Sequence, residues 1–318
     1  MDDSLRTLWS PLTKADLRPL GSSIERVQFL APLSDAEHKQ VATLLKKRPE
    51  VEFRGSVHEG VDDLEFLQHY RDLAHVSLSF FGLKDLCGLQ YLRRDLKTLE
   101  LGATKASGLS LAPLERFTEL RALSIEGQWR DFEVVAKLKR LRELHLRSIT
   151  LPNLAVVRSL KELRGLTLKL GGTTDLGDLS ALKVLRYFEA FQVRGLADLS
   201  PVGKMKSLTH LFLQNLPQVS ELPSLAPLKK LQWVTLEQLK GLKDLKPLAA
   251  APNLQELALF GMKQLQLGDL QPLVGHRSLR SACVGLGSLK RNQQALDLLG
   301  VDDHVTDKFQ AYAEAVTT

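Results

Sequence analysis

The chain has 318 residues, of which 44% are hydrophobic and 25% are charged, the composition of an ordinary globular protein with a long core. Its 43 lysines and arginines against 37 aspartates and glutamates give a net charge of +6, which permits an acidic partner without requiring one. The two cysteines, Cys87 and Cys283, give neither a disulfide framework nor a metal-ligand spacing. No segment resembles a signal peptide or a membrane span, so we expect a cytoplasmic protein that does not enter a membrane; secretion without a cleaved signal stays open.

Residues 1–60 are interpreted as an N-terminal cap. Ser34 and Glu37 have the spacing of a capping box, which predicts an amphipathic helix with Val41, Leu44 and Leu45 on its apolar face, ended by Pro49. This helix lies between two weak copies of a repeat. The first copy is marked by Ile24, Val27 and Phe29, and the second by Arg48, Val51 and Phe53.

Residues 61–287 form the regular part of the chain, in which the phrase L-x-x-L-x-L returns about every 23 residues. Each phrase predicts a short strand with its leucines on one side, and a second phrase, as in Leu225-Ala226-Pro227-Leu228, predicts a short helical return. One unit cannot bury its leucines alone, so stacked units are expected to share a continuous core. The clear copies begin at Leu73, Leu96, Leu120, Leu141, Leu163, Leu185, Leu208, Leu231, Leu254 and Leu279.

The two phrases together resemble the leucine-rich-repeat family, in its short-repeat branch of internalin-like and SDS22-like proteins. The resemblance covers about residues 22–287 and implies an α/β solenoid, with a curved parallel sheet on the concave face and helical or 3₁₀ returns on the convex face. It also implies that the ligand is another protein. The family's asparagine at the turn is missing, since residues such as Leu216 and Leu239 stand in its place. The turn backbone must therefore find its hydrogen bonds elsewhere.

Residues 288–318 are interpreted as a helical C-terminal cap of a single domain. A first helix is predicted from Ser288 to Leu299, ended by Gly300, and a second from about Val305 to Ala315. The intervening Asp302, Asp303 and His304 could hold a metal, but one short turn supplies too few placed ligands. We expect a solvated loop there, and neither a metal nor a cofactor in the protein.

The third, fifth and seventh positions of each phrase are expected to face outward on the concave side. In the four units from Leu185 to Leu254 these positions carry five aromatic residues, although only 6% of the chain is aromatic. An aromatic patch with polar groups between the rings is typical of a protein-binding surface. Alternatively, the rings pack on one another or a terminal segment folds over them. The predicted partner-binding residues are Tyr187, Glu189, Phe191, His210, Phe212, Gln214, Trp233, Glu237 and Phe260.

The second position of the phrase is basic in five successive units and predicts a basic rim. An acidic surface or a phosphate backbone could bind there, but carboxylates lie close by, so a solubilising role is favoured and nucleic acid is an unlikely partner. The rim residues are Lys97, Arg121, Arg142, Arg164 and Arg186.

No motif for catalysis is present. Glu143 and His145 would share one face of a strand, where a Glu–His pair could act as an acid and a base, but a solvated polar ladder is the favoured interpretation. We therefore expect a non-enzymatic scaffold that binds a partner protein, with a regulator or inhibitor as a narrower form. We expect a monomer, and keep nucleic-acid binding and self-association as alternatives.

Overall fold

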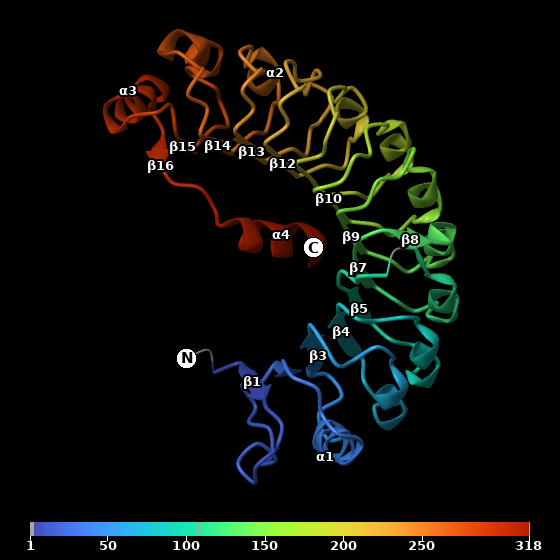
Figure 1. The fold of residues 1–318 in the computed structure, drawn as a ribbon. Helices are drawn as coiled ribbons and strands as arrows, with labels where there is room; N and C mark the ends of the chain where they lie inside the picture. Colours follow the sequence, from blue (N-terminus) through green and yellow to red (C-terminus); the bar gives the residue numbers. More distant parts are fainter. Residues whose placement is uncertain (1–2, 107, 318) are drawn as a thin grey trace. The chain divides into compact units, whose positions relative to one another are not determined.

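The computed structural model describes residues 3–106 and 108–317 (Figure 1). The chain divides into two compact units, Met1–Leu141 and Arg142–Thr318. Over the described ranges, no helix has both the length and the apolar character that crossing a membrane requires.

The first unit is built on a parallel sheet whose strand order follows the chain, apart from one small additional sheet. Its strands are β1 (Leu5–Leu8), β2 (Arg26–Phe29), β3 (Glu52–Val57), β4 (His75–Phe80), β5 (Thr98–Leu101) and β7 (Ala122–Glu126), while β6 (Leu109–Ser110) pairs with β8 (Trp129–Arg130). Its helices are α1 (Asp35–Leu45) and the 3₁₀ helices η1 (Glu65–His69), η2 (Cys87–Tyr91), η3 (Ala112–Arg116) and η4 (Phe132–Lys137).

The predicted start of the N-terminal helix is confirmed. Ser34 caps α1 and shares a reciprocal capping box with Glu37, which satisfies backbone donors at the first turn. The helix buries Val41 and Leu45 in the core, whereas Leu44 stays half-buried. The two weak repeats are confirmed as β2 and β3, whereas β1 was not predicted, because Leu5–Leu8 carries no recognisable copy of the phrase.

The second unit is also a parallel sheet in chain order. Its strands are β9 (Glu143–Arg147), β10 (Gly165–Lys169), β11 (Tyr187–Phe191), β12 (His210–Gln214), β13 (Trp233–Glu237), β14 (Glu256–Phe260), β15 (Ser281–Val284) and β16 (Asp302–Asp303). Its helices are α2 (Lys246–Ala249), α3 (Leu289–Leu299), α4 (Lys308–Thr317) and the 3₁₀ helices η5 (Ala155–Ser159), η6 (Gly177–Ala181), η7 (Val202–Lys204) and η8 (Leu267–Leu273).

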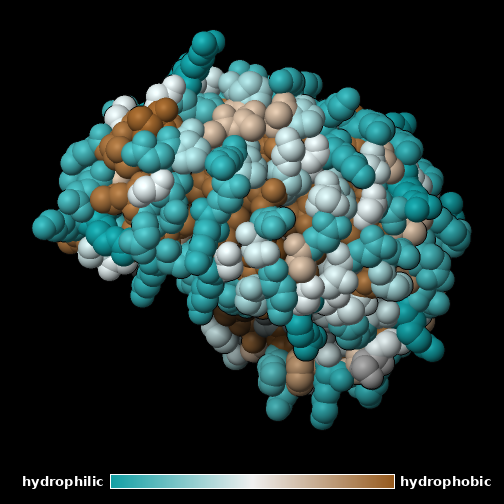
Figure 2. Space-filling model, turned by 90° about the horizontal axis from the view of Figure 1, so that it is seen from above, coloured by the Kyte–Doolittle hydropathy of each residue, from teal (hydrophilic) through white to brown (hydrophobic). Residues whose placement is uncertain are grey.

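The repeated phrase and the strands coincide in this unit. In β12, Leu211 and Leu213 are 2% and 0% exposed, and they alternate with side chains that point to the other face of the sheet. Four of the proline phrases lie in helical returns, for example Pro247 at the start of α2. The phrase at residues 225–228 forms a turn without a helix, so the helical return predicted there is wrong. In Figure 1 the strands of the unit line its inner side and the returns its outer side. The view from above in Figure 2 is mostly hydrophilic, with apolar atoms in smaller patches.

A backbone ladder takes the place of the missing asparagines. The eighth residue of successive phrases is left-handed, with φ of 50° at Gln192 and Asn215 and 53° at Gln238. The N–H of each of these residues donates to a carbonyl of the next repeat, as in Asn215 N to Glu237 O at 2.8 Å. The ninth side chain, such as Leu216, is then free to enter the core, where it is 0% exposed. The turn thus buries a side chain where the family places a polar one.

The two C-terminal helices have different positions. Helix α3 is capped by Ser288, ends at the left-handed Gly300 and packs on η8 and β15 at the end of the sheet. Helix α4 begins three residues after the predicted start and contacts β10, β11 and β12. It lies on the inner side of the strands in Figure 1, not at the end of the sheet where residues 288–318 were expected to form a cap.

Candidate partner-binding face

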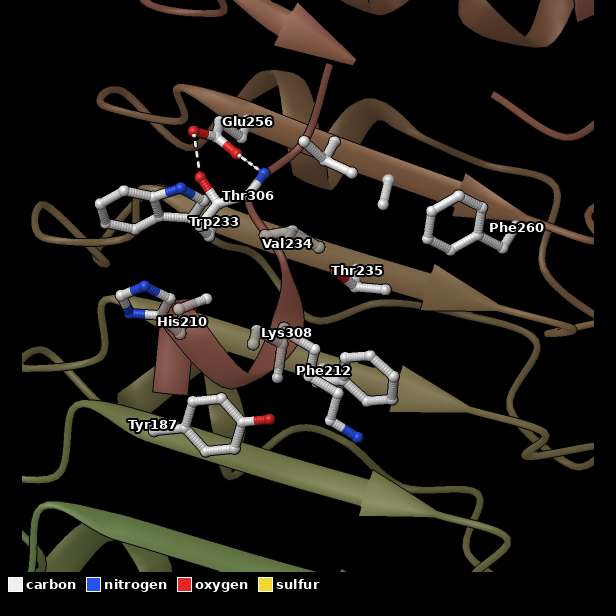
Figure 3. Close-up of a pocket in the computed structure, with 14 residues that line it drawn as sticks. Tyr187, His210, Phe212, Trp233, Val234, Thr235, Glu256, Phe260, Thr306 and Lys308 are labelled. Atoms are coloured by element: carbon white, nitrogen blue, oxygen red, sulfur yellow. Dashed lines mark hydrogen bonds between the residues drawn. The ribbon is translucent and has the colours of Figure 1, made fainter. Parts of the chain in front are cut away.

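The inner face of the second unit carries an aromatic column across three strands. Tyr187, His210 and Trp233 are directly opposite one another in the register of β11, β12 and β13 (Figure 3). The His210 and Trp233 rings are stacked, with centroids 4.2 Å apart, and the centroids of Tyr187 and His210 are 6.3 Å apart. Every strand contributes one ring because the third position of each phrase points to this face.

Three carboxylates from three different strands anchor the C-terminal segment to this face. Glu256 on β14 accepts hydrogen bonds from Thr306 N at 2.7 Å and Thr306 Oγ1 at 2.9 Å. Glu189 on β11 accepts one from Lys308 Nζ. Glu143 on β9 accepts one from the Tyr312 hydroxyl at 2.6 Å. Hydrogen bonds to charged groups are the stronger kind, so the three contacts fix both the position and the direction of the segment.

Apolar contacts complete the docking of α4. Tyr187, Phe212, Ala315 and Val316 form one buried cluster, and Tyr312 packs against its edge. The Tyr312 ring meets the Tyr187 ring edge to face, with centroids 4.8 Å apart. These four buried side chains are removed from water only because the helix and the sheet face each other.

Gly165 on β10 makes the close approach of α4 possible. A Cβ at this position would lie 2.9 Å from Val316 Cγ1 and 3.0 Å from the Tyr312 hydroxyl oxygen. Both distances are too short for unstrained contact, so a larger residue would push the helix away from the strand. The missing side chain leaves the space in which α4 rests.

Glu189 is the electrostatic centre of the contact, being only 2% exposed. It accepts hydrogen bonds from Lys308 and from the Tyr187 hydroxyl, and it pairs with Lys169 at 3.2 Å. The Lys308 ammonium also lies 3.8 Å from the centroid of the Phe212 ring, a cation–π contact. Burial lowers the pKa of Lys308, and the Glu189 carboxylate partly offsets this effect. Burial likewise raises the pKa of Tyr187, helped by the same carboxylate.

Arg164 holds the C-terminal end of α4. Its guanidinium donates to Val316 O at 3.1 Å and to Thr317 O at 3.2 Å. These carbonyls belong to the last turn of the helix, where they have no partner within the helix and carry the negative end of its dipole. A cation in this position therefore stabilises a helix that ends there.

His210 is neutral and leaves one ring nitrogen without a partner. The Thr209 hydroxyl donates to Arg186 O at 3.0 Å, so we assign the 2.8 Å contact between Thr209 Oγ1 and His210 Nδ1 to a proton on Nδ1. Burial lowers the pKa of His210 to about 4. His210 Nε2 and Trp233 Nε1 are both buried, and neither has a hydrogen-bond partner in the part of the chain that is described. His210 and Trp233 are among the residues that line a cavity of about 80 Å³ between the strands and the segment from Val305 to Ala311 (Figure 3).

The comparisons with known proteins agree on the architecture. No family model matches the chain, and neither does any curated protein sequence. Among solved structures, an internalin (inlF) from Listeria monocytogenes superposes with a TM-score of 0.59 at 20% identity, over 93% of this chain and 90% of that one. A chain of the Toll–Spatzle complex from Drosophila superposes with a TM-score of 0.57 at 14% identity, over 82% of this chain and 37% of that one.

The chain has the leucine-rich-repeat fold. The structural likeness and the parallel sheet with short returns both show this architecture. The resemblance found in the repeated phrases is confirmed to that extent. At these sequence identities the likeness concerns the fold and not the ligand.

The nine predicted partner-binding residues of this leucine-rich-repeat chain fall into two groups. The first group lies at or beneath the C-terminal segment and is buried: Tyr187, Glu189, His210 and Phe212. The second group is half-exposed: Phe191, Gln214, Trp233, Glu237 and Phe260. The alternative that a terminal segment folds over the rings therefore holds for the first group, which the C-terminal segment covers. Among the second group, Phe191, Gln214, Glu237 and Phe260 follow one another in register on β11 to β14, and we call these four the open row.

The basic rim is stacked as expected within each unit. Arg121 N bonds to Lys97 O in the first unit, and the same 2.7–2.8 Å ladder joins Arg142, Arg164 and Arg186 in the second. In the second unit two of these side chains have protein partners, because Arg164 binds α4 and Arg142 lies 3.8 Å from Glu162.

The Glu143–His145 pair takes part in docking. Tyr312 lies between the two residues, with its hydroxyl 2.6 Å from Glu143 Oε2 and 3.0 Å from His145 Nε2. Burial acts to raise the pKa of Glu143, but hydrogen bonds from His145 and Tyr312 outweigh it and the pKa is lowered. Elsewhere on the described surface, Asp302 and Asp303 are exposed in β16, and no group of three or more potential ligands is arranged to hold a metal ion.

Proposed function

We propose that this protein is a non-enzymatic scaffold that binds a partner protein on the inner strand face of its second unit. The observation that carries the proposal is the open row, where Phe191 and Phe260 keep part of their rings in solvent with Gln214 and Glu237 between them. Aromatic side chains next to polar groups give large contact area together with directional hydrogen bonds. The chain with the similar fold was solved as part of the Toll–Spatzle complex, which supports a protein as the ligand.

The basic rim supports protein binding over nucleic-acid binding. Arg164 is occupied by the carbonyls of α4, and Arg142 lies close to Glu162. A phosphate backbone would compete with both contacts. If nucleic acid were nevertheless the ligand, binding would weaken steeply with salt, whereas an aromatic surface gives a flat salt response.

The test is capture of proteins from the organism that makes this chain, with the full-length protein as bait. The variant Phe191→Ala/Phe260→Ala removes both rings of the open row. The matched control is Val184→Ala/Val274→Ala, which truncates two residues that are 40% and 43% exposed on the return side. A partner lost with the first variant and kept with the second supports the proposal. If every captured protein survives the loss of both rings in a folded bait, the proposal is wrong.

A regulator or inhibitor is the narrower form of the proposed role. Once a partner is captured, its own activity is measured with and without the scaffold. Inhibition that disappears with Phe191→Ala/Phe260→Ala assigns that role to the open row.

A further inference from the structure

We propose that the strip of the inner face beneath α4 is a receptor for an amphipathic helix of a partner protein, which binds in place of α4 with the same direction and the same pattern of side chains. We call this strip, made of Gly165, Tyr187, Glu189 and Phe212, the covered strip. The proposal rests on the proposed function and names the kind of partner that this surface takes.

Helix α4 itself shows what the covered strip recognises. The side chains that meet the face or its cavity are Lys308, Ala311, Tyr312, Ala315 and Val316, at positions i, i+3, i+4, i+7 and i+8 of one helix face. This spacing is the pattern by which an amphipathic helix lies in a groove. The partner helix therefore carries a cation in its first turn, an aromatic hydroxyl one turn later, and small or β-branched residues in its last turn.

The charges of the face match the helix dipole only when the helix runs in the direction of α4, with its N-terminus near Glu256 and Glu189 and its C-terminus at Arg164. Glu256 and Glu189 bind the beginning of the segment, where the helix dipole is positive. Arg164 binds the last carbonyls, where the dipole is negative. The covered strip also lacks a side chain at Gly165, where a Cβ would lie 2.9 Å from Val316 Cγ1. A helix inserted in the opposite direction would place like charges together at both ends.

Helix α4 satisfies this face only in part. The stacked rings of His210 and Trp233 each keep a buried nitrogen that nothing within residues 3–106 and 108–317 hydrogen-bonds, and the cavity beside them stays open. His210 Nε2 needs a donor and Trp233 Nε1 needs an acceptor, and a buried polar atom without a partner is unfavourable. A partner that replaces the C-terminal segment and whose first turn presents an amide or hydroxyl side chain to these nitrogens makes contacts that α4 lacks.

Helix α4 has the advantage of being tethered. The segment after β16 joins it directly to the sheet, so its effective concentration is on the order of millimolar. A separate helix must overcome this competition, either through the additional contacts or because α4 has been released. Phe309, which is 82% exposed on the outer side of α4, takes no part in the docking.

The experiment measures binding of a fluorescent peptide with the sequence of residues 304–318 to the full-length chain. The opened chain carries Lys308→Ala/Tyr312→Ala, which removes two anchors of its own α4 and leaves the sheet intact. We expect weak binding to the wild-type chain and at least tenfold tighter binding to the opened chain. Ala315→Asp releases α4 by placing a charge in the buried cluster between the helix and the sheet, and it replaces the double variant in the assay if that variant does not fold.

Two pairs of matched variants locate the binding site. On the peptide, Tyr312→Ala should abolish binding and Phe309→Ser should preserve it. On the opened chain, Gly165→Val should weaken binding about 5-fold to 150-fold, from an overpacking cost of about 1–3 kcal/mol. Gly268→Val, where an added Cβ meets no atom within 4 Å, should leave the affinity unchanged.

Three results would overturn the inference. The first is an opened, folded chain that binds the peptide no better than the wild type. The second is an affinity that Gly165→Val leaves unchanged. The third is a dimer, seen by light scattering, in which two copies exchange their α4 helices, because the occupant is then a second copy. None of these results refutes the proposed function, which is tested by the Phe191→Ala/Phe260→Ala variant of the open row and not by the peptide.

Discussion

Gly165→Val is the substitution that tests the docking of α4 most selectively. The added Cβ would lie 2.9 Å from Val316 Cγ1 and 3.0 Å from the Tyr312 hydroxyl oxygen, while the strand itself tolerates a β-branched residue. Overpacking of this kind costs about 1–3 kcal/mol. Since 1.4 kcal/mol corresponds to a factor of ten, the equilibrium constant for release of α4 should rise about 5-fold to 150-fold.

Hydrogen exchange of the α4 amides reads out this release. A free helix of 10 residues is too short to be stable in water, so a released α4 loses its helical hydrogen bonds and exchanges quickly. We expect protection to fall by the factor above in Gly165→Val and to stay unchanged in Gly268→Val. If protection of α4 is the same in Gly165→Val and the wild type, the steric reasoning is wrong.

Three further predictions concern stability. The pKa of His210 is about 4 in the folded state and 6.5 when the ring is exposed, so below pH 6.5 the unfolded state binds more protons than the folded state. The free energy of unfolding is therefore highest above pH 6.5 and falls as the pH drops toward 4. Denaturant titration should show that His210 contributes a loss of about 2 kcal/mol between pH 7 and pH 5, and that this loss is absent in His210→Phe. Lys308, Tyr187 and Glu256 are titratable groups that line the same cavity, and the Glu256 charge favours protonation of His210 while burial opposes it. Leu213→Ala, at a position 0% exposed, should lower the free energy of unfolding by about 2–5 kcal/mol, and an effect below 1 kcal/mol would contradict its place in the core. Ser34→Ala should cost about 1 kcal/mol by removing the cap of α1, and an unchanged melting temperature would contradict that role.

The repeat architecture could be predicted because each repeat is specified by a short segment of the sequence. Each phrase fixes which residues of a strand enter the core, and the period brings the phrases of neighbouring units into register. Tyr187, His210 and Trp233 were placed on one face by this argument alone, and the strand pairing of β11, β12 and β13 confirms it.

The conformation of the turn and the docking position of the C-terminal helix could not be predicted from the repeat period. The left-handed conformation at Gln192 and Asn215 comes with hydrogen bonds to the next repeat. Asparagine favours this conformation, but the glutamine at the same position of the neighbouring repeat does not predict it. Likewise, Tyr312 meets Glu143 across 169 residues, a contact that no repeat spacing encodes. The signals that could have found it are the apolar residues of the last predicted helix, which need a surface, and the glycine at position 165, which leaves space on the strand.

The candidate site was predicted as a patch and is found in two parts. The open row remains a prediction for partner binding, as do the covered residues. Their burial follows from α4, whose position the composition of the face could not determine. A carboxylate such as Glu189 has the same sequence signature whether its cation comes from a partner or from Lys308 of the same chain.

The central claim is that α4 and a partner helix compete for one strip of the sheet. The most direct test compares two numbers: the equilibrium constant for opening of α4, from hydrogen exchange of the wild-type chain, and the ratio of peptide affinities between the opened chain and the wild type. If both processes involve the same site, the affinity of the wild type is reduced by the fraction of open molecules. We predict that the ratio equals the inverse of this fraction within about threefold. Equal affinity for the two chains, with α4 strongly protected in the wild type, would contradict the claim, since the peptide would then bind elsewhere.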